Sequence, residues 1–119
     1  MAKILLAEDD DSMRHFLGRA LERAGHEVFS VSQGDEALPV LAEGRFDLLL
    51  ADIVMPEMDG IELARRAVAA DPAIRIMFIT GFAAVALRNR QTSRSDAKVL
   101  SKPFHLRDLV DEIDKTLAA

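Results

Sequence analysis

The chain has 119 residues, which suits a single domain spanning residues 1–119 and leaves little room for a second. It contains no cysteine, which excludes disulfides, and its three histidines are scattered, which disfavours a histidine-based metal site. The net charge of -5 disfavours nucleic acid as the main partner. Without a membrane-spanning apolar run or a signal-peptide pattern at the start, we expect a cytoplasmic protein with no membrane partner.

Strand-like runs alternate with helix-like runs along the whole chain. The strand-like runs are short and mostly apolar, typical of strands buried on both faces, and cover residues 4–7, 28–31, 48–51, 74–79 and 99–100. The helix-like runs carry apolar residues at helical spacing and cover residues 13–24, 35–43, 61–70 and 106–117. This alternation predicts an α/β fold, in which helices cover both faces of a parallel sheet.

Local signals refine the first helix. Phe16 belongs to the apolar stripe that we expect to face the core, and Arg14 is expected to face outward. Asp11 or Ser12 is expected to cap the N-terminus, and Gly25 follows where a helix C-terminus favours a left-handed residue.

Two later segments fit helices less well. Pro39 is tolerable in the first turn of a helix and would kink anything later. Between the fourth and fifth strand-like runs, the apolar residues 82–87 could form a helix, but residues 88–96 have no apolar stripe, so we expect a shortened or mobile helix within residues 81–97.

Polar residues follow four of the predicted strands at the points where they end. Because ligands bind beyond the carboxyl ends of parallel strands, these side chains should converge on one edge of the sheet. They are Glu8 and Asp9 after the first strand, Asp52 after the third, Thr80 after the fourth and Lys102 after the fifth.

The types of these residues suit phosphoryl chemistry. Three neighbouring carboxylates repel one another unless a cation lies between them, and oxygen ligands without histidine or cysteine suit Mg²⁺. A carboxylate beside that ion can form an acyl phosphate, while Thr80 and Lys102 bind phosphoryl oxygens. Taken singly, each residue is more often a cap, a turn residue or a solvated charge, so the prediction depends on their joint placement.

Several motifs, in this order and spacing, resemble the signature of CheY-like receiver domains of response regulators. The motifs are Glu8-Asp9, Asp52 with Met55-Pro56 and Asp59-Gly60, Thr80-Gly81, and Lys102-Pro103-Phe104. The resemblance covers essentially the whole chain. It implies a flavodoxin-like, doubly wound, five-stranded parallel sheet in the order 2-1-3-4-5, and a switch that a histidine kinase or histidine phosphotransferase phosphorylates.

The resemblance also implies a role for each site residue. Asp52 would be the phosphoacceptor, and Glu8, Asp9, Asp52 and the backbone carbonyl of Val54 would bind Mg²⁺. Thr80 and Lys102 would contact the phosphoryl group, and a cis peptide bond would precede Pro103. In the family, side chains at the positions of Val54 and Phe82 help to place the water that hydrolyses the acyl phosphate. Both are apolar here, so a long-lived phosphorylated form is expected.

Residues 52–87 and 98–106 further resemble the CpdR type of single-domain receiver, which is linked to substrate delivery to the ClpXP protease. Output would then come through a protein target such as ClpXP. The expected partner face includes several basic residues. They would suit an acidic partner, or they could simply form a solvated surface. The face consists of Phe82, Arg88, Arg90, Arg94, Lys98 and Val99. At the position of Val99, many receivers carry an aromatic residue that swings inward on activation. Val99 is not aromatic, so switching through a rotating aromatic side chain is in doubt for this chain.

Two other functions remain open from the sequence. A phosphatase of the haloacid dehalogenase type would also use an Asp nucleophile, but it needs a second Asp two residues later, where this chain has Val54. An adaptor that works without phosphorylation would keep the same acidic residues as a vestige. We favour a phosphoacceptor domain that is not an enzyme beyond its own phosphotransfer and dephosphorylation.

Overall fold

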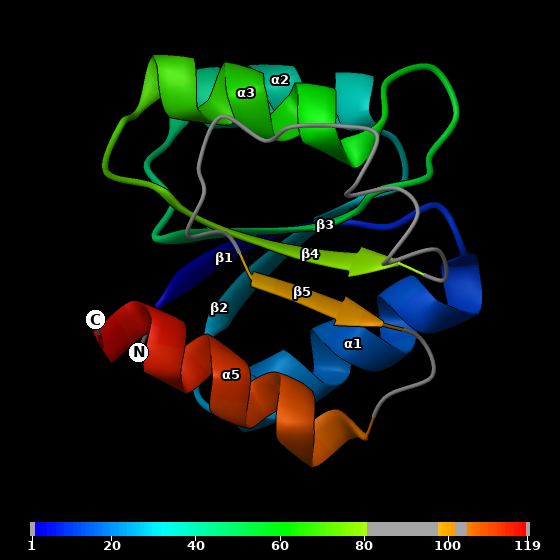
Figure 1. Ribbon diagram of the computed structural model, residues 1–119, viewed down its shortest axis with the longest axis vertical. Helices are drawn as coiled ribbons and strands as arrows, with labels where there is room; N and C mark the ends of the chain where they lie inside the picture. The colour runs from blue at the N-terminus through cyan, green and yellow to red at the C-terminus, as the bar shows by residue number, and fades with distance from the viewer. Residues whose placement is uncertain (1, 81–97, 102–104, 119) are drawn as a thin grey trace.

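The computed structural model describes residues 2–80, 98–101 and 105–118. Its five-stranded parallel sheet has the order β2-β1-β3-β4-β5, as predicted. The strands are β1 (Lys3–Ala7), β2 (Glu27–Val31), β3 (Leu48–Asp52), β4 (Arg75–Thr80) and β5 (Lys98–Ser101). The described helices are α1 (Asp11–Arg23), α2 (Gly34–Glu43), α3 (Gly60–Ala70) and α5 (Leu106–Ala118). Figure 1 shows α2 and α3 over one face of the sheet and α1 and α5 over the other, which is the doubly wound arrangement. None of the described helices is long and apolar enough to span a bilayer.

The central strands supply side chains to two core layers. Alternate residues of a strand point to opposite faces, so Leu5 packs under α2 and α3 while Ile4 and Leu6 pack under α1 and α5. All five residues of β3 are buried. This double-sided burial is why these strands are continuous apolar runs, and it confirms the prediction made for them.

The register of β1 against β3 sets up the site. Ala7 pairs with Ala51, so both strands end at the same level of the sheet. The next residues along the two strands, Glu8 and Asp52, are therefore neighbours at the carboxyl edge. On the other side of β3, Asp52 pairs with Ile79, and Thr80 is the last residue of β4.

The structure corrects three expectations about α1. Its N-cap is Asp10, whose carboxylate accepts a hydrogen bond from the Met13 N–H at 2.9 Å, so neither Asp11 nor Ser12 is the cap. Phe16, expected to face the core, is 56% exposed, because α1 meets the sheet through the stripe that contains Leu17 and Leu21. Arg14, expected to face outward, is partly buried, as described below. Gly25 has a φ of 100°, which confirms the left-handed C-terminus.

Pro39 lies in the second turn of α2, beyond the first turn where it was expected to be tolerable. It is exposed, so water can bind the carbonyl that loses its helical partner, and the helix runs on to Glu43. The shortened or mobile helix expected within residues 81–97 lies outside the described residues.

Candidate functional site

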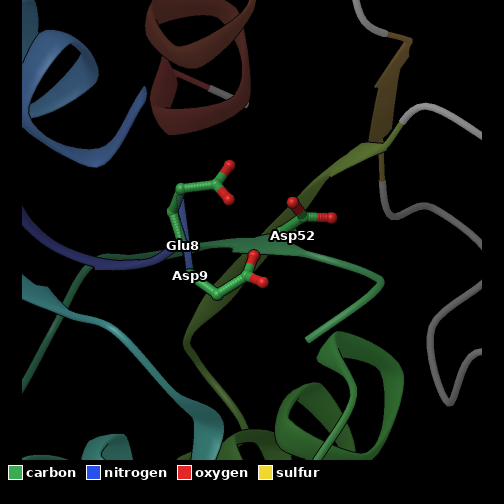
Figure 2. A group of neighbouring side chains, drawn as sticks. All are labelled: Glu8, Asp9 and Asp52. Atoms are coloured by element: carbon green, nitrogen blue, oxygen red, sulfur yellow. The ribbon is translucent and has the colours of Figure 1, made fainter. Parts of the chain in front are cut away.

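Three carboxylates meet at the carboxyl edge of the sheet. Glu8, Asp9 and Asp52 each offer a carboxylate oxygen, and these oxygens all lie within 4.8 Å of one another. Figure 2 shows the three side chains gathered around one point, two of them from the end of β1 and one from the end of β3. The predicted convergence of these three residues is therefore present in the structure.

The three carboxylates differ in exposure. Glu8 is fully buried and Asp52 is 5% exposed, while Asp9 is exposed to solvent. Removing carboxylates from water beside one another costs free energy, which hydrogen-bond donors and cations offset. Oxygen donors alone, one of them open to solvent, match a hard divalent cation that keeps part of its water shell. The donor set therefore fits Mg²⁺.

Backbone amides orient two of the carboxylates. The Asp10 N–H donates to Glu8 Oε2 at 3.2 Å, and the Val54 N–H donates to Asp52 Oδ1 at 3.1 Å. Each donor lies two residues after its acceptor, so the loop that leaves each strand turns back on the acid at its end. The main chain therefore orients the carboxylates of Glu8 and Asp52, one at each strand end.

Gly60 explains how the β3–α3 loop packs so closely on Asp52. Its N–H donates to the Ile53 carbonyl at 2.9 Å. A Cβ atom at this position would overlap the carbonyl oxygen of Asp52, so only glycine allows the approach. In the sequence, Gly60 is recognisable only as part of the Asp59-Gly60 motif. Its contact with Asp52 was not predicted, because the contact depends on where the loop folds back.

Arg14 is the second residue that sequence reasoning missed. Its side chain is 22% exposed, and Nη1 donates to the backbone carbonyl of Glu8 at 3.0 Å. Helical periodicity placed Arg14 among outward-facing residues, and nothing in the local sequence marks a contact with the preceding strand end. Arg14 lies three residues after the last of four consecutive acids, a spacing that favours its ion pair with Asp11 but does not indicate a bond to the Glu8 carbonyl.

The structure describes only some of the other predicted site residues. Val54 follows Ile53 in the β3–α3 loop, and this residue is 53% exposed. Thr80 ends β4 in register with Ser101 of β5, which places its backbone at the same edge as Asp52. Lys102 and Pro103 lie outside the described residues.

The predicted partner face is described only at β5. Val99 is partly buried against the core layer that α2 and α3 cover, and Lys98 is the first residue of the strand. Phe82, Arg88, Arg90 and Arg94 lie outside the described residues, so this face remains a prediction.

Comparison with known proteins gives consistent results. Residues 4–114 match the sequence model of the response regulator receiver domain. Over 119 residues the chain is 64% identical to the response regulator receiver protein CpdR of Brucella abortus, covering 100% of this chain and 99% of that protein.

Solved structures agree with this assignment. The receiver domain of the hybrid histidine kinase CckA superposes with a TM-score of 0.82 at 31% identity, covering 97% of this chain and 98% of that one. The response regulator TrrA of Thermotoga maritima, in complex with Mg²⁺-BeF, superposes with a TM-score of 0.86 at 27% identity, covering 98% and 99%. The chain belongs to the response regulator receiver domain family, and it is a receiver domain of two-component signal transduction.

Proposed function

We propose that residues 1–119 act as one receiver domain and that phosphorylation of Asp52 switches it. The observation that carries the proposal is the cluster in which oxygens of Glu8, Asp9 and Asp52 lie within 4.8 Å of one another. Asp52 is a buried member of this cluster, and the Val54 N–H holds one of its carboxylate oxygens. A carboxylate fixed in this way is ready to attack a phosphorus atom in line.

Magnesium is the proposed cofactor. Its ligands would be the carboxylates of Glu8, Asp9 and Asp52 with the backbone carbonyl of Val54. When bound, Mg²⁺ supplies the positive charge that neutralises the carboxylates and a phosphoryl group together. The relative TrrA, whose solved structure carries Mg²⁺-BeF, supports this assignment.

The transfer itself requires little from the protein beyond position and charge. An oxygen of Asp52 forms a bond to phosphorus as the bond between phosphorus and the donor histidine nitrogen breaks, and that nitrogen keeps the electron pair. Thr80 and Lys102 are proposed to bind the phosphoryl oxygens. The phosphoryl donor is proposed to be a histidine kinase or a histidine phosphotransferase.

The output is proposed to be protein–protein interaction, with no nucleic acid or membrane partner and a cytoplasmic location. The CpdR protein of Brucella abortus is 64% identical along the full chain, which supports a CpdR-like role in ClpXP-dependent proteolysis. A phosphatase is not favoured, because Val54 occupies the position where that reaction needs a carboxylic acid. The domain would act as a phosphoacceptor that assists its own phosphorylation and dephosphorylation.

Thermal melting with the phosphoryl mimic beryllofluoride tests the proposal. A ligand that binds only the folded state raises the melting temperature. We expect Mg²⁺ and beryllofluoride together to stabilise the wild type, and Asp52→Asn to abolish that response because the variant lacks the carboxylate that the mimic binds. Asp71→Asn, at the far end of α3, should respond like the wild type. An equal response from Asp52→Asn would contradict the proposal.

A further inference from the structure

A single guanidinium group joins the end of β1 to the first turn of α1. Arg14 Nη1 donates to the Glu8 carbonyl oxygen at 3.0 Å, and Arg14 Nη2 donates to Asp11 Oδ1 at 2.6 Å. The Arg14 side chain is only 22% exposed, although arginine is usually found at the surface. The planar fork of donors that arginine carries allows one side chain to hold both acceptors.

The Glu8 carbonyl matters because of the group to which it belongs. It lies in the planar peptide unit that joins Glu8 to Asp9, so a bond that fixes this oxygen also fixes the direction in which the chain enters Asp9. The Glu8 carboxylate is held separately, by the Asp10 N–H at 3.2 Å. Together these bonds hold the turn that carries two of the three clustered acids.

We propose that Arg14 is a positioning residue for the acidic cluster. By holding the Glu8–Asp9 peptide unit, it sets the spacing at which their carboxylates meet Asp52, and so prepares the cluster for a divalent cation. This inference rests on the proposed magnesium site and deepens it. Groups that orient metal ligands without touching the metal typically affect affinity strongly.

The charge of Arg14 acts in the opposite direction from its hydrogen bonds. A cation beside the cluster repels Mg²⁺, so the loss of this charge alone would tighten Mg²⁺ binding. The loss of the hydrogen bonds would weaken it, because the Glu8–Asp9 turn would no longer be fixed. The sign of the change therefore separates a positioning role from a purely electrostatic one.

Isothermal titration with Mg²⁺ provides the test. We expect Arg14→Gln to bind Mg²⁺ about 10–100-fold more weakly than the wild type. Arg14→Lys keeps the charge but lacks the fork, so it should also bind more weakly. Arg19→Gln removes the same charge from an exposed position five residues further along α1 and should change the affinity little.

The outcomes are distinct. Arg14→Gln binding as tightly as the wild type or more tightly, or losing no more affinity than Arg19→Gln, would overturn the proposal. If melting in EDTA shows that Arg14→Gln is unfolded, Arg14→Lys decides in its place, and wild-type affinity in that variant overturns the proposal. If the wild type itself binds no Mg²⁺, the proposed function fails together with this inference. If the wild type binds and the Arg14 variants match it, only the role of Arg14 is lost.

Discussion

The residue two positions after Asp52 in the following loop, Val54, has an apolar side chain. The Val54 N–H donates to Asp52 Oδ1, but Val54 is 53% exposed and its side chain has no group that can orient water. An acyl phosphate on Asp52 would therefore be hydrolysed without help from this position. At the scale of single residues, the lifetime of the acyl phosphate depends on whether the main chain and the nearest side chains can position a water molecule for hydrolysis.

Val54→Asn is expected to shorten that lifetime several-fold, because an amide can hold a water molecule close to the phosphorus. The measurement is the loss of labelled phosphoryl from the purified, phosphorylated protein. Val54→Ile keeps an apolar surface and should leave the rate near that of the wild type. A wild-type signal that decays within seconds, or an Asn variant that decays no faster, would contradict this expectation.

Gly60→Ala is expected to destabilise the fold by about 1–3 kcal/mol, the usual cost of forcing an extra carbon into a packed site. Its Cβ would overlap the Asp52 carbonyl oxygen, so the loop must shift and phosphoryl uptake should also slow. Urea unfolding and uptake from acetyl phosphate measure the two effects.

Gly18→Ala is the matched control for Gly60→Ala. A Cβ there meets Ser30 Oγ at 3.5 Å, an ordinary contact, and the position is inside α1. It should gain about 0.5–1 kcal/mol from the better helix propensity of alanine. If both alanines had the same effect, the close approach at Gly60 would not be the cause.

At the scale of elements, an acidic side chain accepts backbone N–H groups at the starts of α1, α2 and α3. Asp10 caps α1, Asp59 caps α3 through the Glu62 N–H, and Glu36 folds back over the start of α2. The order and approximate extent of the strands and helices were predictable from the periodicity of the apolar residues. The identity of the α1 cap was not, because Asp10, Asp11 and Ser12 are all good caps and tertiary packing chooses among them.

Asp10→Ala is expected to cost about 1 kcal/mol of stability, because the Met13 N–H loses its partner. Ser12→Ala should cost much less, since Ser12 lies inside the first turn. Urea unfolding in EDTA, which removes any contribution from bound cations, compares the two variants. Equal losses would contradict the assignment of the cap.

Glu36 makes the stability of α2 depend on pH. Its carboxylate accepts hydrogen bonds from the Ser32 hydroxyl at 2.7 Å and from the Ser32 and Gln33 N–H groups, and these lower the pKa of Glu36 below its ordinary value of 4.5. A lowered folded-state pKa stabilises the fold above the unfolded value, and the stabilisation is lost as pH falls through the folded pKa.

Glu36→Gln is therefore expected to be less stable than the wild type at neutral pH, with the difference shrinking as the pH drops below 4.5. Urea unfolding over a pH series measures the difference. A difference that stays constant down to the most acidic pH at which both proteins fold would show that the carboxylate charge is not responsible.

At the scale of the whole molecule, the parallel sheet turns separated segments of sequence into one site. Glu8 and Asp52 are far apart in sequence, and the pairing of Ala7 with Ala51 brings them to the same level. This convergence was predictable from the alternation of strands and helices, because parallel strands share a carboxyl edge. The contacts of Arg14 and Gly60 were not predictable, since they depend on loop paths that no periodicity encodes.

The central claim is that Asp52 takes up the phosphoryl group at a magnesium site. The most direct measurement is peptide mapping by mass spectrometry after incubation with acetyl phosphate and Mg²⁺. We predict one phosphoryl group per chain, located on Asp52, and none in Asp52→Asn or in the wild type with EDTA. A phosphoryl group on any other residue, or undiminished uptake by Asp52→Asn, would contradict the account.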